Sequence, residues 1–301
     1  MHFTRSIPFI SEIHSRQRRL NNMMAKFLRW PAVLLSLTIA ASLGAAQYGG
    51  GASSMPSATP APQDNKGKDK GDKNQKIDKK EEAAYKAFYA ARTGDPNVQI
   101  QLGEDFATKY PQSHYLNGVY ATLTTAYYVS GNTDKMFEDG AKALALDPDN
   151  VDVLSLLAMA IPRRVKATTP DGAQQLQNAE KYAHHAIELI PNMTKPAEID
   201  DAAFEKAKND KLSLCHSGLG LINLNHSKFD DARTELTQAV TLASNPDVVD
   251  YYLLGNADVG ASYYHDAVAA YQKCSDSGPL AAACKQRAAS AQHDAETKLG
   301  R

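Results

Sequence analysis

The chain has 301 residues, with 33 Lys and Arg against 34 Asp and Glu, so its formal net charge is −1. A charge this close to zero provides no overall field for nucleic acid or for an anionic membrane surface, and we predict neither as a partner of the folded chain. Hydrophobic residues make up 43% of the sequence, a share compatible with a packed helical array.

The first predicted element is an export signal. Lys26 and Arg29 form a basic start, the stretch from Trp30 to Leu43 is apolar, and the small residues Gly44 to Ala46 follow it. This is the layout of a secretory signal peptide, and the apolar stretch is short for a membrane span, which needs about 20 residues. We therefore expect residues 1–46 to be an N-terminal extension with a cleaved signal, and the mature chain to be periplasmic or secreted. The alternative is an uncleaved signal that anchors the chain in the inner membrane, its one expected link to a membrane.

Residues 47–80 are predicted to be a disordered linker. The segment is first rich in Gly, Pro and Ser and then alternates Lys with Asp, and it has almost no apolar side chains to bury. The entropy lost on ordering such a segment is not offset by burial. For its lysine-rich part, Lys66 to Lys80, we favour a solvated linker, and the alternative is a tether to an anionic lipid or cell-wall polymer.

After the linker, the sequence repeats with a period of about 34 residues. The segment from Asn117 to Asn150 contains two amphipathic stretches around a turn at Gly131, and Pro148 lies at its end. The segment from Val248 to Pro279 has the same layout. Glycine allows the positive φ of a turn, and proline stops a helix because it has no N–H to donate. Each unit is therefore predicted to be a pair of helices, and about five units follow one another.

Some parts of the repeat region depart from this unit. Pro162 falls inside an expected first helix, so the stretch from Pro162 to Thr169 is predicted to break the array. Residues 191–211 are extra, and we interpret them as a loop followed by an N-terminal extension of the next helix from about Asp200. Leu280 to Leu299 is predicted to be one more helix, whose broad polar face caps the array.

Small residues recur where the paired helices are expected to cross. Helix axes approach to about 8–10 Å only where the side chains at the crossing are small. The expected crossing residues are Ala158, Gly220 and Gly255 on first helices, and Ala179, Ala232 and Ala267 on second helices.

These features together resemble the tetratricopeptide repeat (TPR) family over residues 81–300. The resemblance implies an all-α fold, a right-handed α-solenoid of antiparallel helix pairs with a C-terminal capping helix. It also implies a non-catalytic protein–protein interaction scaffold, which binds a protein or peptide on the concave face made by the first helices.

Placing each first helix by its predicted core residues gives candidates for that concave face. They combine apolar and aromatic side chains with amides and two arginines, and they lack the Lys and Asn cluster with which some family members hold a peptide carboxylate. The alternative for each residue is packing against a neighbouring helix. The candidates are Phe88, Arg92, Thr125, Tyr128, Met159, Arg163, Leu221, Asn225, Tyr252 and Asn256.

The chain has three cysteines. Cys274 closes the last unit and Cys284 opens the capping helix, so the two are expected to face each other across an antiparallel turn. In an exported protein they can form a disulfide, and the alternative is two buried thiols. Cys215 is left unpaired in either case.

Motifs that carry catalysis are missing from the sequence. It has no phosphate-binding glycine loop, no nucleophile elbow and no zinc-binding HExxH motif. His184 and His185 are adjacent, so on a helix they diverge by about 100° and cannot share a metal without a third partner. We predict no catalytic residue, metal or cofactor. The function expected is an interaction scaffold outside the cytoplasm. The alternatives are a structural or tethering component of the cell envelope and, less favoured, an enzyme with an unrecognised site.

Overall fold

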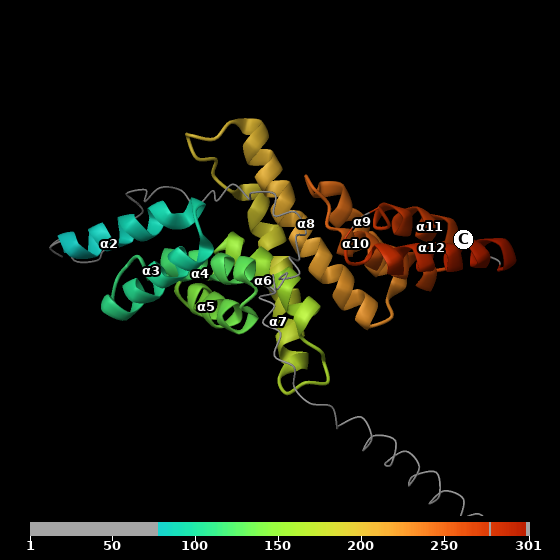
Figure 1. Ribbon diagram of the computed structural model, residues 1–301, viewed down its shortest axis with the longest axis horizontal. Coiled ribbons are helices and arrows are strands. Elements are labelled where there is room, and N and C mark those ends of the chain that lie inside the picture. Colours follow the sequence, from blue (N-terminus) through green and yellow to red (C-terminus); the bar gives the residue numbers. More distant parts are fainter. Residues whose placement is uncertain (1–77, 277, 299–301) are drawn as a thin grey trace, which may run out of the picture. The chain divides into compact units, whose positions relative to one another are not determined.

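The computed structural model describes residues 78–276 and 278–298. In this part of the chain every regular element is a helix (Figure 1), so the predicted all-α fold is confirmed. The elements are α2 (Lys79–Ala90), the 3₁₀ helix η1 (Ala91–Thr93), α3 (Pro96–Lys109), α4 (Leu116–Ser130), α5 (Thr133–Leu146), α6 (Val151–Arg164), α7 (Gly172–Leu189), the 3₁₀ helix η2 (Ile190–Asn192), α8 (Asp201–Asn225), α9 (Phe229–Leu242), α10 (Val248–Gly260), α11 (Tyr264–Lys273) and α12 (Ala281–Thr297).

Consecutive helices pack against each other, as the repeat predicts. The pairs are α2 with α3, α4 with α5, α6 with α7, α8 with α9 and α10 with α11, and α12 packs on α11 (Figure 1). Between α4 and α5 the turn is made by Gly131, whose φ of 77° is in the left-handed region. Asn132 then begins α5, because its side chain accepts a hydrogen bond from the backbone N–H of Lys135. Local capping chemistry therefore places the turn where the sequence pattern predicted it.

Helix α2 begins earlier than expected. The carboxylate of Asp78 accepts a hydrogen bond from the backbone N–H of Lys80 at 2.9 Å, and Lys79 is the first helical residue. A cap of this kind stabilises a helix start by about 1 kcal/mol. The prediction of disorder is thus wrong for residues 78–80. The rest of the predicted linker and the predicted signal lie outside the described residues.

Helix α6 continues through Pro162 and ends at Arg164. The predicted break therefore begins at Val165, which caps the helix, rather than at Pro162. A proline in the last turn removes one hydrogen bond, the one to the carbonyl of Ala158 four residues earlier. Packing compensates for that loss, because every residue from Val153 to Pro162 is buried.

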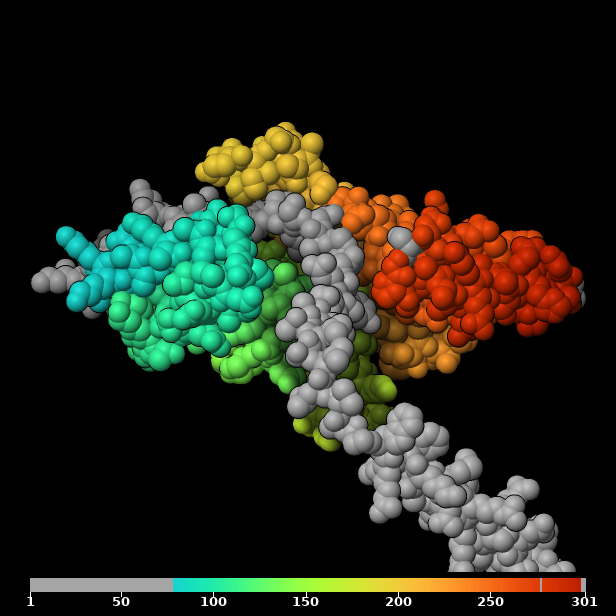
Figure 2. Space-filling model, in the orientation of Figure 1, coloured from blue at the N-terminus to red at the C-terminus, as the bar shows by residue number. Residues whose placement is uncertain are grey.

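Helix α8 carries the extension predicted from about Asp200. The carboxylate of Asp200 accepts a hydrogen bond from the backbone N–H of Ala203 at 2.8 Å and so fixes the first turn. The first turns of α8, drawn in yellow, project from the neighbouring helices (Figures 1 and 2). Further along, the carboxylate of Asp210 accepts hydrogen bonds from the backbone N–H and hydroxyl of Ser244, at 2.7 and 3.0 Å, which ties α8 to the segment after α9.

The small residues predicted at the helix crossings are buried. Ala158, Ala179, Ala232 and Ala267 are each 0% exposed. The two predicted glycines lie against large side chains of the partner helix, and a Cβ added at either would come within 2.5 Å of that side chain. The contacts are Gly220 with Leu236 and Gly255 with Tyr271.

One close crossing was not predicted. A Cβ added at Gly218 on α8 would lie 2.2 Å from the carbonyl oxygen of Ala158 on α6. This is the carbonyl that Pro162 leaves without a helical donor. The two helices therefore approach backbone to backbone at this point, and the sequence signal for it is the joint presence of Pro162 and a second glycine two residues before Gly220.

The predicted capping helix is α12. A disulfide joins Cys274, directly after α11, to Cys284 near the start of α12, with the two Cα atoms 5.9 Å apart. Both cysteines are buried in one cluster with Tyr271 and Ala291, whereas Cys215 is a free, buried thiol. Within the described residues, no helix combines the length and apolar character needed to cross a membrane.

Candidate functional site

Two of the predicted concave-face residues are core residues. Phe88 and Met159 are 1% and 2% exposed and belong to the same hydrophobic cluster, so predicting them as ligand contacts was wrong. Phe88 packs on α3 at Gly103, where a Cβ would touch its ring. Met159 is covered because α6 packs closely against α8, and Leu214 of α8 adjoins the cluster.

Other candidates are partly buried and engaged within the fold. The guanidinium of Arg92 donates a hydrogen bond to the backbone carbonyl of Tyr89 at 2.9 Å, and its central carbon lies 3.8 Å above the centre of the Tyr89 ring. Asn256 accepts a hydrogen bond from the hydroxyl of Tyr271 at 2.8 Å. The ring of Tyr252 packs on the same tyrosine, with 6.0 Å between ring centres. Arg92, Tyr252 and Asn256 are predicted to contact a ligand, with packing inside the fold as the alternative. The contacts that the structure shows for them are of the second kind.

A third group remains accessible. Thr125 and Tyr128 are exposed, as is Asn225 at the end of α8, and Leu221 is half-buried against the cluster formed by α8, α9 and α10. Tyr128 is 41% exposed, which is unusual for so large a ring, and Val129 beside it is 57% exposed. Exposed apolar side chains of this size are candidates for contact with a partner.

Arg163 is the centre of a polar network that joins the first helices of successive units. Its Nη1 donates to Oδ2 of Asp247 at 2.7 Å, and its Nη2 donates to Oδ1 of Asp250 at 2.7 Å and to the hydroxyl oxygen of Ser217 at 2.9 Å. The hydroxyl of Ser217 in turn donates to Oδ1 of Asp250 at 2.6 Å. The network thus links α6, α8 and α10.

This network is largely removed from water. The side chains of Arg163 and Asp250 are 18% and 6% exposed. Burial raises the pKa of the Asp250 carboxyl, and the charge of Arg163 and the hydrogen bond from Ser217 oppose that rise. Burial of its hydroxyl group raises the pKa of Tyr128, again opposed by the charge of Arg163. The hydroxyl end of this side chain is therefore close to the network, while 41% of the residue stays exposed. Because intramolecular acceptors already engage both Nη atoms of Arg163, this guanidinium supports the surface and is not a free clamp for a ligand carboxylate.

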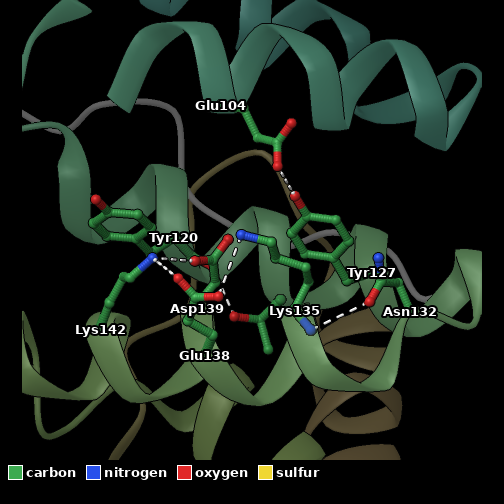
Figure 3. A network of polar contacts seen from close by, with 9 residues as sticks. Glu104, Tyr120, Tyr127, Asn132, Lys135, Glu138, Asp139 and Lys142 are labelled. Atoms are coloured by element: carbon green, nitrogen blue, oxygen red, sulfur yellow. Dashed lines mark hydrogen bonds and ion pairs between the residues drawn. The ribbon is translucent and has the colours of Figure 1, made fainter. Parts of the chain in front are cut away.

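A second polar network fixes α3, α4 and α5 (Figure 3). The hydroxyl of Tyr127 donates to Oε1 of Glu104 at 2.6 Å, and burial together with this bond raises the pKa of Tyr127 well above its usual value. The ammonium of Lys142 donates to Glu138 at 2.7 Å and to Asp139 at 2.9 Å. The donors and acceptors of this network are paired with one another, and we assign it to helix packing.

A groove of about 420 Å³ lies between the second helices α5 and α7, over α6. Sequence reasoning missed it because the candidates were sought on first helices alone. The sequence feature that could have indicated this groove is a mixture of polar and aromatic residues at helical spacing on two successive second helices, α5 and α7. The groove is lined by Asp134, Phe137, Glu138 and Ala141 of α5, Leu157 and Ile161 of α6, and Gln175, Asn178 and Tyr182 of α7.

No group of three or more His, Cys, Asp or Glu side chains in the described residues is arranged to hold a metal ion. The histidines make isolated pairs instead. Nε2 of His185 is 2.8 Å from Oδ1 of Asp149, and Nδ1 of His216 is 2.7 Å from Oε2 of Glu235. The first pair joins α7 to the turn before α6 and the second joins α8 to α9, and neither pair includes a nucleophile.

Comparison with known proteins gives similarity to solved structures only, since no protein-family model and no curated protein matches the sequence. A thermophilic TPR protein of Thermus thermophilus is 18% identical, with 71% of this chain and 99% of that chain covered and a TM-score of 0.44. A MamA RS-1 ArsTM double mutant is 12% identical, with 74% and 100% covered and a TM-score of 0.41. A tetratricopeptide repeat protein from Parabacteroides merdae is 14% identical, with 70% and 98% covered and a TM-score of 0.30. The present chain has the all-α fold of a tetratricopeptide-repeat protein, because its sequence repeats with a period of about 34 residues and its helices pack in consecutive pairs.

Proposed function

We propose that this chain is a non-catalytic interaction scaffold that binds a protein or peptide through its first helices, outside the cytoplasm. The observation that supports it best is the exposed ring of Tyr128 beside the network of Arg163, Asp247 and Asp250. Tyrosine is enriched at protein interfaces, because a large rigid ring loses little conformational entropy on binding. Here the ring stands next to side chains that α6, α8 and α10 hold in place.

The chemistry of this surface favours an internal segment of a partner over a chain terminus. Both Nη atoms of Arg163 are hydrogen bonded within the fold, so the arginine offers them to no terminal carboxylate. The accessible groups are the hydroxyl of Thr125, the ring of Tyr128 and the amide of Asn225. These groups suit apolar contact and neutral hydrogen bonds with a peptide backbone.

Site-specific photo-crosslinking tests this proposal in the full chain. A benzophenone amino acid in place of Tyr128 should give a discrete adduct with a partner. The matched control is the same substitution at Val98, which is 51% exposed on α3, a helix that contributes no residue to the Arg163 network. An adduct specific to position 128 supports the proposed surface. Equal adducts at both positions, or none at position 128, contradict it.

Export is tested separately, because it rests on residues 1–46 alone. N-terminal sequencing of the protein from cells should give a mature chain that starts near Gln47. An intact chain recovered from the cytosol with residues before Ala46 still attached would contradict export and leave the binding proposal standing.

A further inference from the structure

We propose a second binding site, the groove between α5 and α7, whose ligand is a short extended peptide segment with a basic residue next to an apolar one. The two walls of the groove come from second helices of successive units, so this site is separate from the Tyr128 surface on the first helices. It requires neither the partner nor the location inferred above.

The groove is built from two stripes that face each other. Asp134, Phe137 and Ala141 follow at intervals of three and four residues and so share one face of α5. Asn178 and Tyr182 share a face of α7 in the same way. Both helices pack on α6, while α5 and α7 make at most marginal contact with each other. The space between the stripes is therefore left open above α6.

The length of the groove suits a short piece of extended chain. The stripe on α5 runs from Asp134 to Ala141, which at a rise of about 1.5 Å per residue is about 10 Å. An extended chain advances about 3.3 Å per residue, so about three residues fit along the stripe. The volume of about 420 Å³ is within the range of ligand pockets, about 300–1,000 Å³.

The floor of the groove is apolar. Leu157 and Ile161 of α6 are 2% and 6% exposed, because Phe137 and Tyr182 pack against the same hydrophobic cluster from the two walls and largely cover them. The rings of Phe137 and Tyr182 are themselves only partly buried, and one apolar side chain of a ligand can pack between them. Burial of a Leu or Ile side chain is the main source of affinity that a groove of this size can provide.

The walls determine which peptide fits. On α7, Gln175 presents a donor and an acceptor, the pair of functions that a peptide backbone needs. Asn178 adds the donor N–H groups of its amide, while its Oδ1 already accepts a hydrogen bond from Nε2 of Gln174 at 3.0 Å. On α5, the carboxylate of Glu138 is neutralised by Lys142 at 2.7 Å and Lys135 at 3.2 Å.

The second acidic group of the groove is Asp134, which is exposed in the first turn of α5. No ion pair to it is formed by the residues that the structure describes. Within the described part of the chain, Asp134 is therefore the acidic side chain of the groove without a cationic partner. Its negative charge would attract a Lys or Arg that lies beside the apolar residue of the ligand.

Capped tripeptides test the site in the full chain. The probes are acetyl-Lys-Leu-Ala-amide, the same peptide with Glu in place of Lys, and the same peptide with Ser in place of Leu. Titration of methyl-labelled protein, followed by NMR, should shift the signals of Leu157 and Ile161 in a saturable way. We expect the Lys peptide to bind about twofold to fivefold more tightly than the Glu peptide, the effect of one exposed ion pair. The Ser peptide should not saturate the shift.

Variants separate the parts of the proposal. Asp134→Asn should remove the preference for Lys over Glu and keep the dependence on Leu. Ala141→Trp, at an exposed position, should fill the groove and abolish the shifts, while Ala289→Trp at an exposed position of α12 is the matched control. Unchanged circular dichroism will show that both variants fold. The site is refuted if the Lys and Glu peptides bind equally, if Ala141→Trp still binds, or if the shifts occur at Leu221 near the first-helix surface instead.

Discussion

Nη2 of Arg163 on α6 is 2.7 Å from Oδ1 of Asp250 on α10, although these helices belong to units that are not neighbours in the array. In repeat proteins each unit is usually coupled only to the units next to it. Here the intervening helix α8 contributes Ser217 to the same network. The third and fifth units are therefore coupled directly, and a change in one should be detectable in the other.

Arg163→Met should destabilise the protein by about 3–5 kcal/mol, because it leaves the buried carboxylate of Asp250 without its cationic partner. Hydrogen exchange should accelerate in both α6 and α10 and stay slow in α3. Chemical unfolding and exchange measurements check this. A loss below about 1 kcal/mol, the value of an exposed pair, would show that the network does not couple the units.

Gly218→Ala should cost more stability than Gly220→Ala, although both glycines are buried on α8. The new Cβ at position 218 meets the backbone carbonyl of Ala158 at 2.2 Å, and a helix backbone cannot move aside. At position 220 it meets the side chain of Leu236, with Cγ at 2.5 Å, and a side chain can shift more easily than a helix backbone.

We expect a loss of about 3 kcal/mol or more for Gly218→Ala. For Gly220→Ala we expect a smaller net loss of about 0–2 kcal/mol, since overpacking against a side chain costs about 1–3 kcal/mol and alanine gains about 1 kcal/mol of helix propensity over glycine. Thermal or urea unfolding compares the two variants. If they were equally stable, the backbone contact between α6 and α8 would have to be looser than described.

Stability should depend on pH through Asp258. Its side chain is 2% exposed, and burial raises its pKa from 3.8 to about 6, against the hydrogen bond and charge of Arg233 at 2.8 Å. A carboxyl with a raised pKa in the folded state favours folding at low pH. That contribution is complete below the unfolded pKa and is lost as pH rises through about 6.

The difference in unfolding free energy between the natural chain and Asp258→Asn should therefore fall by up to about 3 kcal/mol from about pH 4 to about pH 7. Asparagine keeps an acceptor for Arg233 but does not ionise. Urea unfolding at a series of pH values measures the difference. A constant difference over this range would show that the carboxyl of Asp258 titrates at its ordinary pKa.

The disulfide between Cys274 and Cys284 closes a short loop, with a sequence separation of 10. Its stabilisation should therefore be at most roughly 2–3 kcal/mol. Reduction should loosen α12 first and leave the other helix pairs folded. Peptide mapping without reductant identifies the bond, and free thiols at both positions in the protein isolated from cells would rule it out.

The sequence by itself determined the helix pairs, the small residues at their crossings and the capping helix. It did so because each depends on chemistry that acts over a few residues. Gly131 is the residue that can turn with positive φ, and Asp200 caps the helix that follows it. On α7, Ala179, Ala183 and Ala186 recur at the spacing of a helix face, and all three are buried.

Only the tertiary structure decided which of the predicted surface residues are buried. Phe88 and Met159 are predicted for the concave face from their helical position, but both are buried. Met159 is buried because α8 packs along α6, and Phe88 because α3 approaches it at Gly103. The partners of Arg163 are 84 and 87 residues away. The helical period places side chains around one helix axis. It does not specify the rotation from one unit to the next, and that rotation determines which distant side chains meet.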